Sequence, residues 1–320
     1  MPKASPIEIK EASSFSARVQ LLLVKAAGVQ SIFFRYPGMQ RLTHAIANLF
    51  DNQNTAILTL PLGGDLEIFL NDGYWCRLLK RGFTYEPELE NVFRRVLAAP
   101  NVYFIDCGAN IGYWSVLASQ LLPPECCVAV EAAPPQYAKL LRNAKLNHDR
   151  FLAVSGALWS HDGEMLVIVT NERWHAGSSV VNWKEKVGQT RYHEHRIESV
   201  TIDSLCDKYI PSADAKVLIK LDVEGAEVQA LEGARKVLAS RETIVIYEDH
   251  GQDSSCRTSV FFFDNHACEV FYCDDHNIVT RMSSIADVRK VKTQTSVGYN
   301  FYACSRNSEF SRLLSSQVAS

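Results

Sequence analysis

Acidic residues follow four hydrophobic segments that have the composition of buried β-strands. Asp106 follows VYFI, Glu131 follows CVAV, Asp222 follows KVLIKL, and residues 248–250, Glu-Asp-His, follow TIVIY. In open α/β sheets, ligands bind outside the carboxyl ends of the strands. We therefore expect these side chains to gather around one cleft, where they could bind a cation, accept hydrogen bonds from hydroxyls or take up a proton.

A glycine-containing turn begins at Asp106, in the segment DCGANIG. Its glycines, Gly108 and Gly112, permit close backbone approach, and the next helix offers its N-terminal N–H groups to an anion. The spacing departs from the dinucleotide pattern G-x-G-x-x-G. Asp106 would repel a pyrophosphate, whereas S-adenosylmethionine presents an ammonium to the acid and a carboxylate to the helix. The turn therefore favours S-adenosylmethionine over NAD.

Two of the other acidic segments each allow a functional and a structural interpretation. Glu131 can accept hydrogen bonds from both ribose hydroxyls of such a cofactor, or it can simply begin the helix that follows two prolines. Residues 248–250 are either an acid–base or metal-binding cluster beside the cleft, or solvated turn residues. The sequence leaves both alternatives open for residues 248–250 and favours the ribose interpretation for Glu131.

The segment KLDVEGAE places Lys220, Asp222 and Glu224 at alternate positions. Side chains at alternate positions of an extended chain lie on one side of it, so these three residues are predicted to face a common site. Glu227, in contrast, is explained by the favourable position of an acid in the first turn of a helix.

The elements that must position these residues alternate between strand and helix. From residue 100 to about 306, hydrophobic strands and amphipathic helices follow one another with short turns, and the last strands close the sheet. Strands that are hydrophobic nearly throughout are typical of a parallel sheet buried on both faces. The prediction is a doubly wound, Rossmann-like α/β domain over 100–306 with an antiparallel C-terminal strand.

The remaining segments are predicted to be smaller units. Residues 1–58 carry hydrophobic positions at helical spacing and are expected to be a helical extension. Residues 59–99 are expected to contain three short strands separated at Gly63-Gly64 and at Asp72-Gly73, with the hairpin signal at Asn71-Asp72-Gly73, followed by a lead-in helix that begins near Pro87. Residues 307–320 are expected to be a flexible tail. In residues 19–34, packing on the protein is favoured, and peripheral membrane contact is left open.

Composition excludes several classes of protein. The 320 residues carry a formal net charge of −3, without the basic surface that nucleic acid requires. No stretch is long and apolar enough to span a membrane. The nine cysteines include no Cys-x-x-Cys pair, which favours a reducing, cytoplasmic location.

A long stretch without clear periodicity, residues 170–199, interrupts the domain. Loops of this length inside compact domains are usually functional. Flat side chains with polar edges suit a sugar ring, so this stretch is expected to contact a substrate, although the same aromatic residues could instead anchor the loop. The candidate substrate contacts are Trp174, His175, Trp183, Arg191 and Tyr192.

Three segments of the chain resemble the FkbM-type family of class I S-adenosylmethionine-dependent methyltransferases. They are FIDCGANIGYWS, AVEAAPPQ and, most specifically, IKLDVEGAEVQALEGA. The resemblance covers about residues 59–305 and implies O-methylation of a sugar, glycan or secondary metabolite. It implies cofactor contacts by the residues of the turn and of the next two strand ends. These are Asp106, Gly108, Ala109, Asn110, Gly112, Glu131, Ala132, Ala157 and Leu158.

The resemblance also implies that Asp222 and Glu224 face the transferred methyl group. An alcohol loses its proton during attack, and we expect Asp222 or His250 to take it while Glu224 positions the acceptor. A divalent ion held by Asp222 with Glu248, Asp249 or His250 is left open, because Mg²⁺ prefers hard oxygen ligands. Two other functions remain as alternatives: a methyltransferase-like binding or scaffold module without turnover, and an NAD-dependent oxidoreductase.

Overall fold

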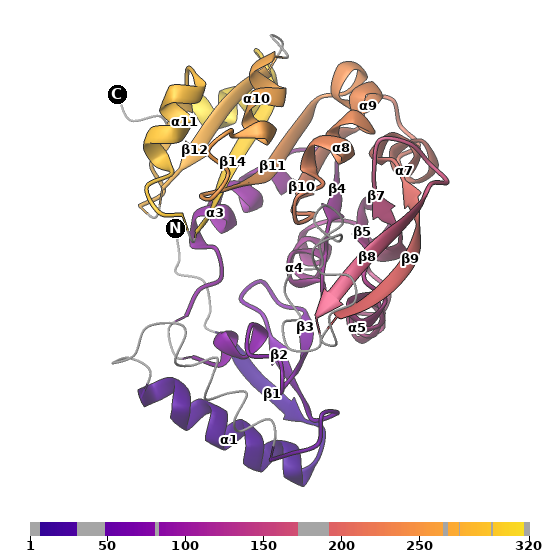
Figure 1. Ribbon diagram of the computed structural model, residues 1–320, viewed down its shortest axis with the longest axis vertical. Coiled ribbons are helices and arrows are strands. Elements are labelled where there is room, and N and C mark those ends of the chain that lie inside the picture. Colours follow the sequence, from indigo (N-terminus) through magenta and orange to yellow (C-terminus); the bar gives the residue numbers. More distant parts are fainter. Residues whose placement is uncertain are drawn as a thin grey trace.

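An eight-stranded sheet forms the centre of the molecule (Figure 1). The computed structural model describes residues 7–30, 49–80, 83–171, 192–264, 268–274, 276–295 and 297–316. The strand order is β13-β12-β14-β11-β10-β4-β5-β6. The strands are β4 (Val102–Cys107), β5 (Cys127–Glu131), β6 (Leu152–Ser155), β10 (Lys216–Leu221), β11 (Thr243–His250), β12 (Cys268–Cys273), β13 (Val279–Met282) and β14 (Gly298–Ser305).

The directions of these strands confirm the predicted fold class. Strands β6, β5, β4, β10 and β11 pair in parallel, so their carboxyl ends meet at one edge of the sheet. The last strand, β14, inserts antiparallel between β11 and β12. The chain therefore forms a doubly wound, Rossmann-like sheet with an antiparallel C-terminal strand.

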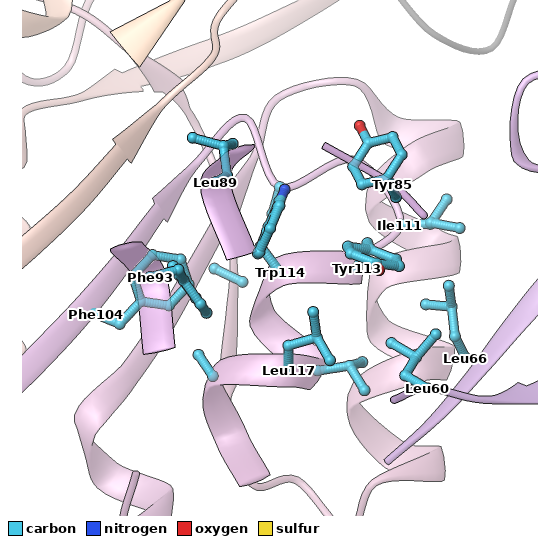
Figure 2. Packing of buried hydrophobic residues seen from close by; sticks show 14 of the residues in the cluster. Leu60, Leu66, Tyr85, Leu89, Phe93, Phe104, Ile111, Tyr113, Trp114 and Leu117 are labelled. Carbon is cyan, nitrogen blue, oxygen red and sulfur yellow. The ribbon is translucent and has the colours of Figure 1, made fainter. Parts of the chain in front are cut away.

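Helices cover both faces of the sheet. One face packs on α3 (Pro87–Leu97), α4 (Tyr113–Leu121) and α5 (Pro134–Leu146), the other on α7 (Ile202–Tyr209), α8 (Glu227–Glu232), α9 (Arg235–Ser240), α10 (Arg257–Asp264) and α11 (Ile285–Val291). Successive strand residues alternate between the two cores: Phe104 joins the first, and Ile105 joins the second. Figure 2 shows Phe104 packed with Phe93 and Trp114 in the first core.

A small antiparallel sheet precedes the main domain, in the order β1-β2-β3. It contains β1 (Glu8–Ala12), β2 (Thr55–Thr59) and β3 (Asp65–Phe69), with α1 (Phe15–Gln30) beside it (Figure 1). The two strands predicted on either side of Gly63-Gly64 are present as β2 and β3, which pair antiparallel. The helical extension predicted for residues 1–58 is partly wrong: the helix α1 is present, but β1 and β2 pair with each other as strands.

The hairpin predicted at Asn71-Asp72-Gly73 is wrong, because the segment after it is not a strand but a 3₁₀ helix, η1 (Trp75–Leu79). Oδ1 of Asp72 accepts hydrogen bonds from the backbone N–H groups of Tyr74 and Trp75, and the Asp72 carbonyl accepts one from the N–H of Cys76. An aspartate that bonds to the following backbone in this way competes with strand pairing and starts a helical turn.

Two other regions complete the fold. A second small sheet, in the order β7-β9-β8, contains β7 (Ala157–Leu158), β8 (Met165–Asn171) and β9 (Tyr192–Val200). The flexible tail predicted for residues 307–320 is wrong for α12 (Glu309–Ser315). Its Phe310 and Leu314 are fully buried, and Oγ of Ser308 caps its N-terminus.

The helix α1 packs one side on the small sheet and exposes the other. Ala17, Leu21 and Val24 are buried, whereas Phe15 is 81% and Leu22 67% exposed. Within the described ranges, no helix has the length and hydrophobicity to cross a membrane. Peripheral membrane contact of residues 19–34 stays a prediction, and residues 31–34 lie outside the described part of the chain.

Candidate functional site

A cleft opens where β4, β5 and β10 end, and we call it the main cleft. The structure brings together here all but one of the predicted cofactor residues, and the predicted methyl-facing acids join them. The predicted residues that line the main cleft are Asp106, Gly108, Ala109, Asn110, Glu131, Ala132, Ala157, Leu158, Asp222 and Glu224.

The turn after β4 requires glycine because β10 ends against it. A Cβ atom on Gly108 would lie 1.9 Å from the carbonyl oxygen of Asp222, and its φ of +83° is left-handed. Asn110 is also left-handed, with φ of 53°. Gly112 is the one predicted cofactor residue that does not line the main cleft. It packs against α5, where a Cβ on Gly112 would lie 2.7 Å from Cδ1 of Leu140.

Glu131 lies at the end of β5 and connects two backbone segments. Its Oε2 accepts a hydrogen bond of 2.8 Å from the N–H of Asn110, and its Oε1 accepts one of 2.8 Å from the N–H of Ala133. The side chain is only 5% exposed, and this burial raises the pKa of Glu131 to about 7. A carboxylate oxygen can accept more than one hydrogen bond, so both oxygens can still accept from a diol in the main cleft.

Asp106 is more deeply buried than a surface ligand contact would be. It is 1% exposed, and its Oδ2 accepts a hydrogen bond of 2.5 Å from Oγ of Ser115 on α4. Burial raises its pKa, although Lys220, its direct neighbour on β10, acts in the opposite direction. Asp106 thus places a buried negative charge in the lining of the main cleft.

Lys220 is a buried cation among carboxylates. Its Nζ lies 3.0 Å from Oδ2 of Asp222. Burial by itself would lower the pKa of Lys220, but the charges of Asp222, Glu86 and Asp106 outweigh it and raise that pKa. The ammonium therefore stays charged and holds the Asp222 carboxylate in place.

Glu86 also belongs to the carboxylates around Lys220, and the sequence did not predict this. It precedes α3 with a left-handed φ of 43°, and its Oε2 accepts a hydrogen bond of 2.9 Å from Nε1 of Trp114. Burial raises the pKa of Glu86 to about 6, with Lys220 opposing the shift. The available signal was the segment Glu86-Pro87-Glu88, which is equally typical of an ordinary helix start.

Aromatic side chains form one wall of the main cleft, and the sequence did not predict them either. They are Tyr74, Trp75, Tyr85, Tyr113 and Trp114. Figure 2 shows Tyr85, Tyr113 and Trp114 close together, with ring centroids 4.7 Å apart for the first pair. Nε1 of Trp75 donates a 3.2 Å hydrogen bond to Oδ1 of Asn110, so η1 contacts the glycine turn directly.

A second depression, the adjoining hollow, lies beyond the main cleft at the end of β11. It is lined by Glu224, Gly225, Glu227, Val228, Glu248, Asp249, His250, Gln252, Asp253, Arg257 and Thr258. Glu224 lines both depressions, so they meet at this residue. His250 is exposed at the mouth of the adjoining hollow, and its Nδ1 accepts a hydrogen bond from the N–H of Gln252.

The metal site left open by the sequence is not assembled. Oδ1 of Asp249 lies 2.5 Å from Nζ of Lys292, and Oδ2 accepts a hydrogen bond from Ser259. Alternation along β11 therefore directs Asp249 to the face opposite Glu248. In the part of the chain that the structure describes, no three His, Cys, Asp or Glu side chains group to hold a metal ion.

The predicted substrate contacts largely fall in the undescribed part of the long loop. Trp174, His175, Trp183 and Arg191 lie outside the described residues, and Tyr192 is described only as the first backbone position of β9. Their role in binding stays a prediction.

Comparison with known proteins identifies a family to which the sequence is similar. Residues 106–276 match the family model described as the methyltransferase FkbM domain. A search of curated protein sequences finds no match.

Solved structures of methyltransferases are similar to the chain at low sequence identity. An FkbM methyltransferase from Methylobacillus flagellatus is 14% identical, with 89% of this chain and 59% of that chain covered and a TM-score of 0.38. An O-methyltransferase from Bacillus cereus in complex with SAH is 10% identical, with 71% and 84% covered and a TM-score of 0.38. A precorrin-6y C5,15-methyltransferase from Geobacter metallireducens is 13% identical, with 70% and 92% covered and a TM-score of 0.35.

Proposed function

The chain belongs to the FkbM methyltransferase family, and from that premise we propose that it transfers the methyl group of S-adenosylmethionine to a hydroxyl of a small-molecule or glycan acceptor. The observation that carries the proposal is the assembly of the predicted cofactor residues around the main cleft at the carboxyl ends of β4 and β5. Nucleic acid is not an expected partner, because the net charge is −3.

The residues of the main cleft fit this cofactor. Glu131 presents two carboxylate oxygens that suit the ribose diol. Ala157 and Leu158 offer a buried apolar surface for the adenine. The buried charge of Asp106 favours the ammonium and the sulfonium, and it disfavours the pyrophosphate of NAD.

Bound S-adenosylmethionine would supply a sulfonium methyl group that is already a strong electrophile. The protein then has to align the acceptor oxygen with that methyl group and exclude water, and alignment alone is worth roughly 7–11 kcal/mol. Asp222 is fixed by Lys220 for this purpose, and Glu224 lies where the two depressions meet.

Calorimetric titration with S-adenosylhomocysteine and, separately, with NAD tests the proposal. We expect S-adenosylhomocysteine to bind and NAD not to bind. The same protein should transfer a radiolabelled methyl group from S-adenosylmethionine into a cell extract. Binding of NAD alone would contradict the proposal in favour of an oxidoreductase, and binding of S-adenosylhomocysteine without any transfer would favour a scaffold module.

The location of the protein is proposed on its thiols. All nine cysteines are free, and eight of them are buried. Unpaired thiols are typical of a reducing compartment, and this supports a cytoplasmic location.

A further inference from the structure

Besides Glu224, which is expected to position the acceptor, three side chains near the meeting point of the two depressions are chemically able to accept a proton: Asp222, His250 and Glu248. Asp222 is already held by the Lys220 ammonium, which lies 3.0 Å from its Oδ2 and so occupies one of its two oxygens. His250 is exposed at the end of β11, where water competes for its ring nitrogens. Glu248 has neither of these disadvantages.

Glu248 lies beside Asp222 on the same face of the sheet. The registers Lys220 to Ile246 and Leu221 to Tyr247 bring the end of β10 next to Glu248 on β11. Alternation then directs Asp222 and Glu248 to the same side. The two carboxylates thus belong to one site, although α8 and α9 lie between them in the sequence.

The Glu248 side chain occupies space that a glycine leaves free. A Cβ atom on Gly298 of β14 would lie 1.2 Å from Oε1 of Glu248. Within the described ranges, no side chain or loop backbone group forms a hydrogen bond to the Glu248 carboxylate. Glu248 is half-buried and lines the adjoining hollow, so its carboxylate is available to a ligand there.

We infer that the adjoining hollow binds a neutral, hydroxyl-bearing acceptor and that Glu248 takes the proton of the hydroxyl being methylated. This inference rests on the proposed function. As the acceptor oxygen bonds to the methyl carbon, the bond from that carbon to sulfur breaks and its electron pair stays on sulfur. The O–H proton passes to the Glu248 carboxylate, so no further reactant is needed.

The charges around the adjoining hollow explain why the acceptor is neutral. Carboxylates outnumber cations in the lining of the adjoining hollow, which contains the acids Glu224, Glu227, Glu248, Asp249 and Asp253 and the cation Arg257. A phosphate or carboxylate on the acceptor would therefore meet an excess of negative charge among the described residues. Hydroxyl groups, in contrast, donate hydrogen bonds to these acids.

The proton affinity of Glu248 agrees with this role. Burial, and then the charges of Asp222, Glu224 and Glu86, raise its pKa well above the ordinary value, while Lys220 opposes them. A carboxylate that binds a proton more tightly is a stronger base, and a positioned general base contributes a factor of about 10²–10⁴ to the rate.

Four variants test the inference: Glu248→Gln, Gly298→Ala, His250→Gln and, as a control with the same charge change, Glu232→Gln on the exposed end of α8. Gly298→Ala leaves the Glu248 charge intact but displaces the side chain. The assay uses radiolabelled S-adenosylmethionine and a cell extract separated by anion exchange into a neutral and an anionic fraction. Affinity for S-adenosylhomocysteine, measured by calorimetry, and circular dichroism are recorded for every variant.

The wild type should label the neutral fraction only. Glu248→Gln and Gly298→Ala should lower transfer at least about 100-fold with unchanged affinity for S-adenosylhomocysteine. Glu232→Gln should match the wild type, and His250→Gln should lower transfer less than Glu248→Gln does. Full transfer by Glu248→Gln, or labelling of the anionic fraction, would overturn the inference alone. A wild type that does not bind S-adenosylhomocysteine would overturn the proposed function, and the inference with it.

Discussion

The ammonium of Lys220 lies 3.0 Å from the carboxylate of Asp222, at the point where β10 ends against the glycine turn. The Lys220 side chain is 7% exposed, and Asp106 and Glu86 add their charges to the same cation. One buried lysine therefore balances several carboxylates that would otherwise repel one another. The stability of the site and its chemistry depend on the same ion pair.

Replacement of Lys220 by Met should destabilise the fold by roughly 3 kcal/mol, because it leaves buried carboxylates without their cation. Urea unfolding followed by circular dichroism measures the loss. The double variant Lys220→Met with Asp222→Asn should recover part of it, since the second substitution removes one of the orphaned charges. If the single and double variants unfold at the same urea concentration, the pair does not carry this role.

The raised pKa of Glu131 predicts that the stability of the fold depends on pH. The folded protein raises its pKa from 4.5 to about 7, mainly through burial, so the fold binds this proton more tightly than the unfolded chain does. The resulting stabilisation is fully present below about pH 4.5 and is lost as the pH rises to 7, in total roughly 3 kcal/mol.

The measurement for Glu131 is the difference in unfolding free energy between the wild type and Glu131→Gln from pH 4 to pH 8. The amide cannot ionise, so the wild type should lose stability relative to the variant as the pH rises. Two curves that stay parallel over this range would show that the Glu131 pKa is not raised.

Gly108 should be far less replaceable than a glycine with a similar backbone in open space. Gly108→Ala would place Cβ 1.9 Å from the Asp222 carbonyl oxygen, whereas Gly163, with φ of +78°, has its nearest atom at 4.0 Å. Gly163→Ala should cost about 1 kcal/mol from backbone strain alone. Gly108→Ala should cost several-fold more, measured by thermal unfolding. Equal losses would show that β10 can move away from the turn.

The sequence was sufficient for the fold class and for the strand-end acids, because both follow from local patterns. Hydrophobic strands identified the sheet, and the period of two correctly placed Lys220 with Asp222. The same period of two, applied to β11, places Asp249 and Glu248 on opposite faces of the sheet. The prediction of a possible metal site did not take this alternation into account.

Other parts of the site depend on contacts between distant segments and left no local pattern. Glu86 reads as a helix start, and only tertiary packing brings it to Trp114 and Lys220. The α12 helix is short and has only two fully buried hydrophobic residues, Phe310 and Leu314. Two positions are too few for a helical period to be recognised in the sequence.

Trp75 tests whether the N-terminal region belongs to the cofactor site. Its Nε1 donates a 3.2 Å hydrogen bond to Oδ1 of Asn110, in the turn that also bonds to Glu131. Asn143 adds a second connection, since its Nδ2 donates to the Ile111 carbonyl while its Oδ1 accepts from the Glu67 N–H of β3. The small sheet and η1 therefore hold the turn in its left-handed conformation.

Trp75→Phe keeps an aromatic ring in the wall of the main cleft but removes the hydrogen bond to Asn110. A neutral hydrogen bond contributes about 0.5–1.5 kcal/mol, so affinity for S-adenosylhomocysteine should fall roughly 2- to 12-fold while the circular dichroism spectrum is unchanged. Trp159→Phe, whose indole lies outside the cleft lining, is the matched control and should bind as the wild type does. Because Trp75 precedes the residues that match the family, 106–276, a selective loss in Trp75→Phe would extend the cofactor site beyond that segment. Equal affinity in both variants would confine the site to it.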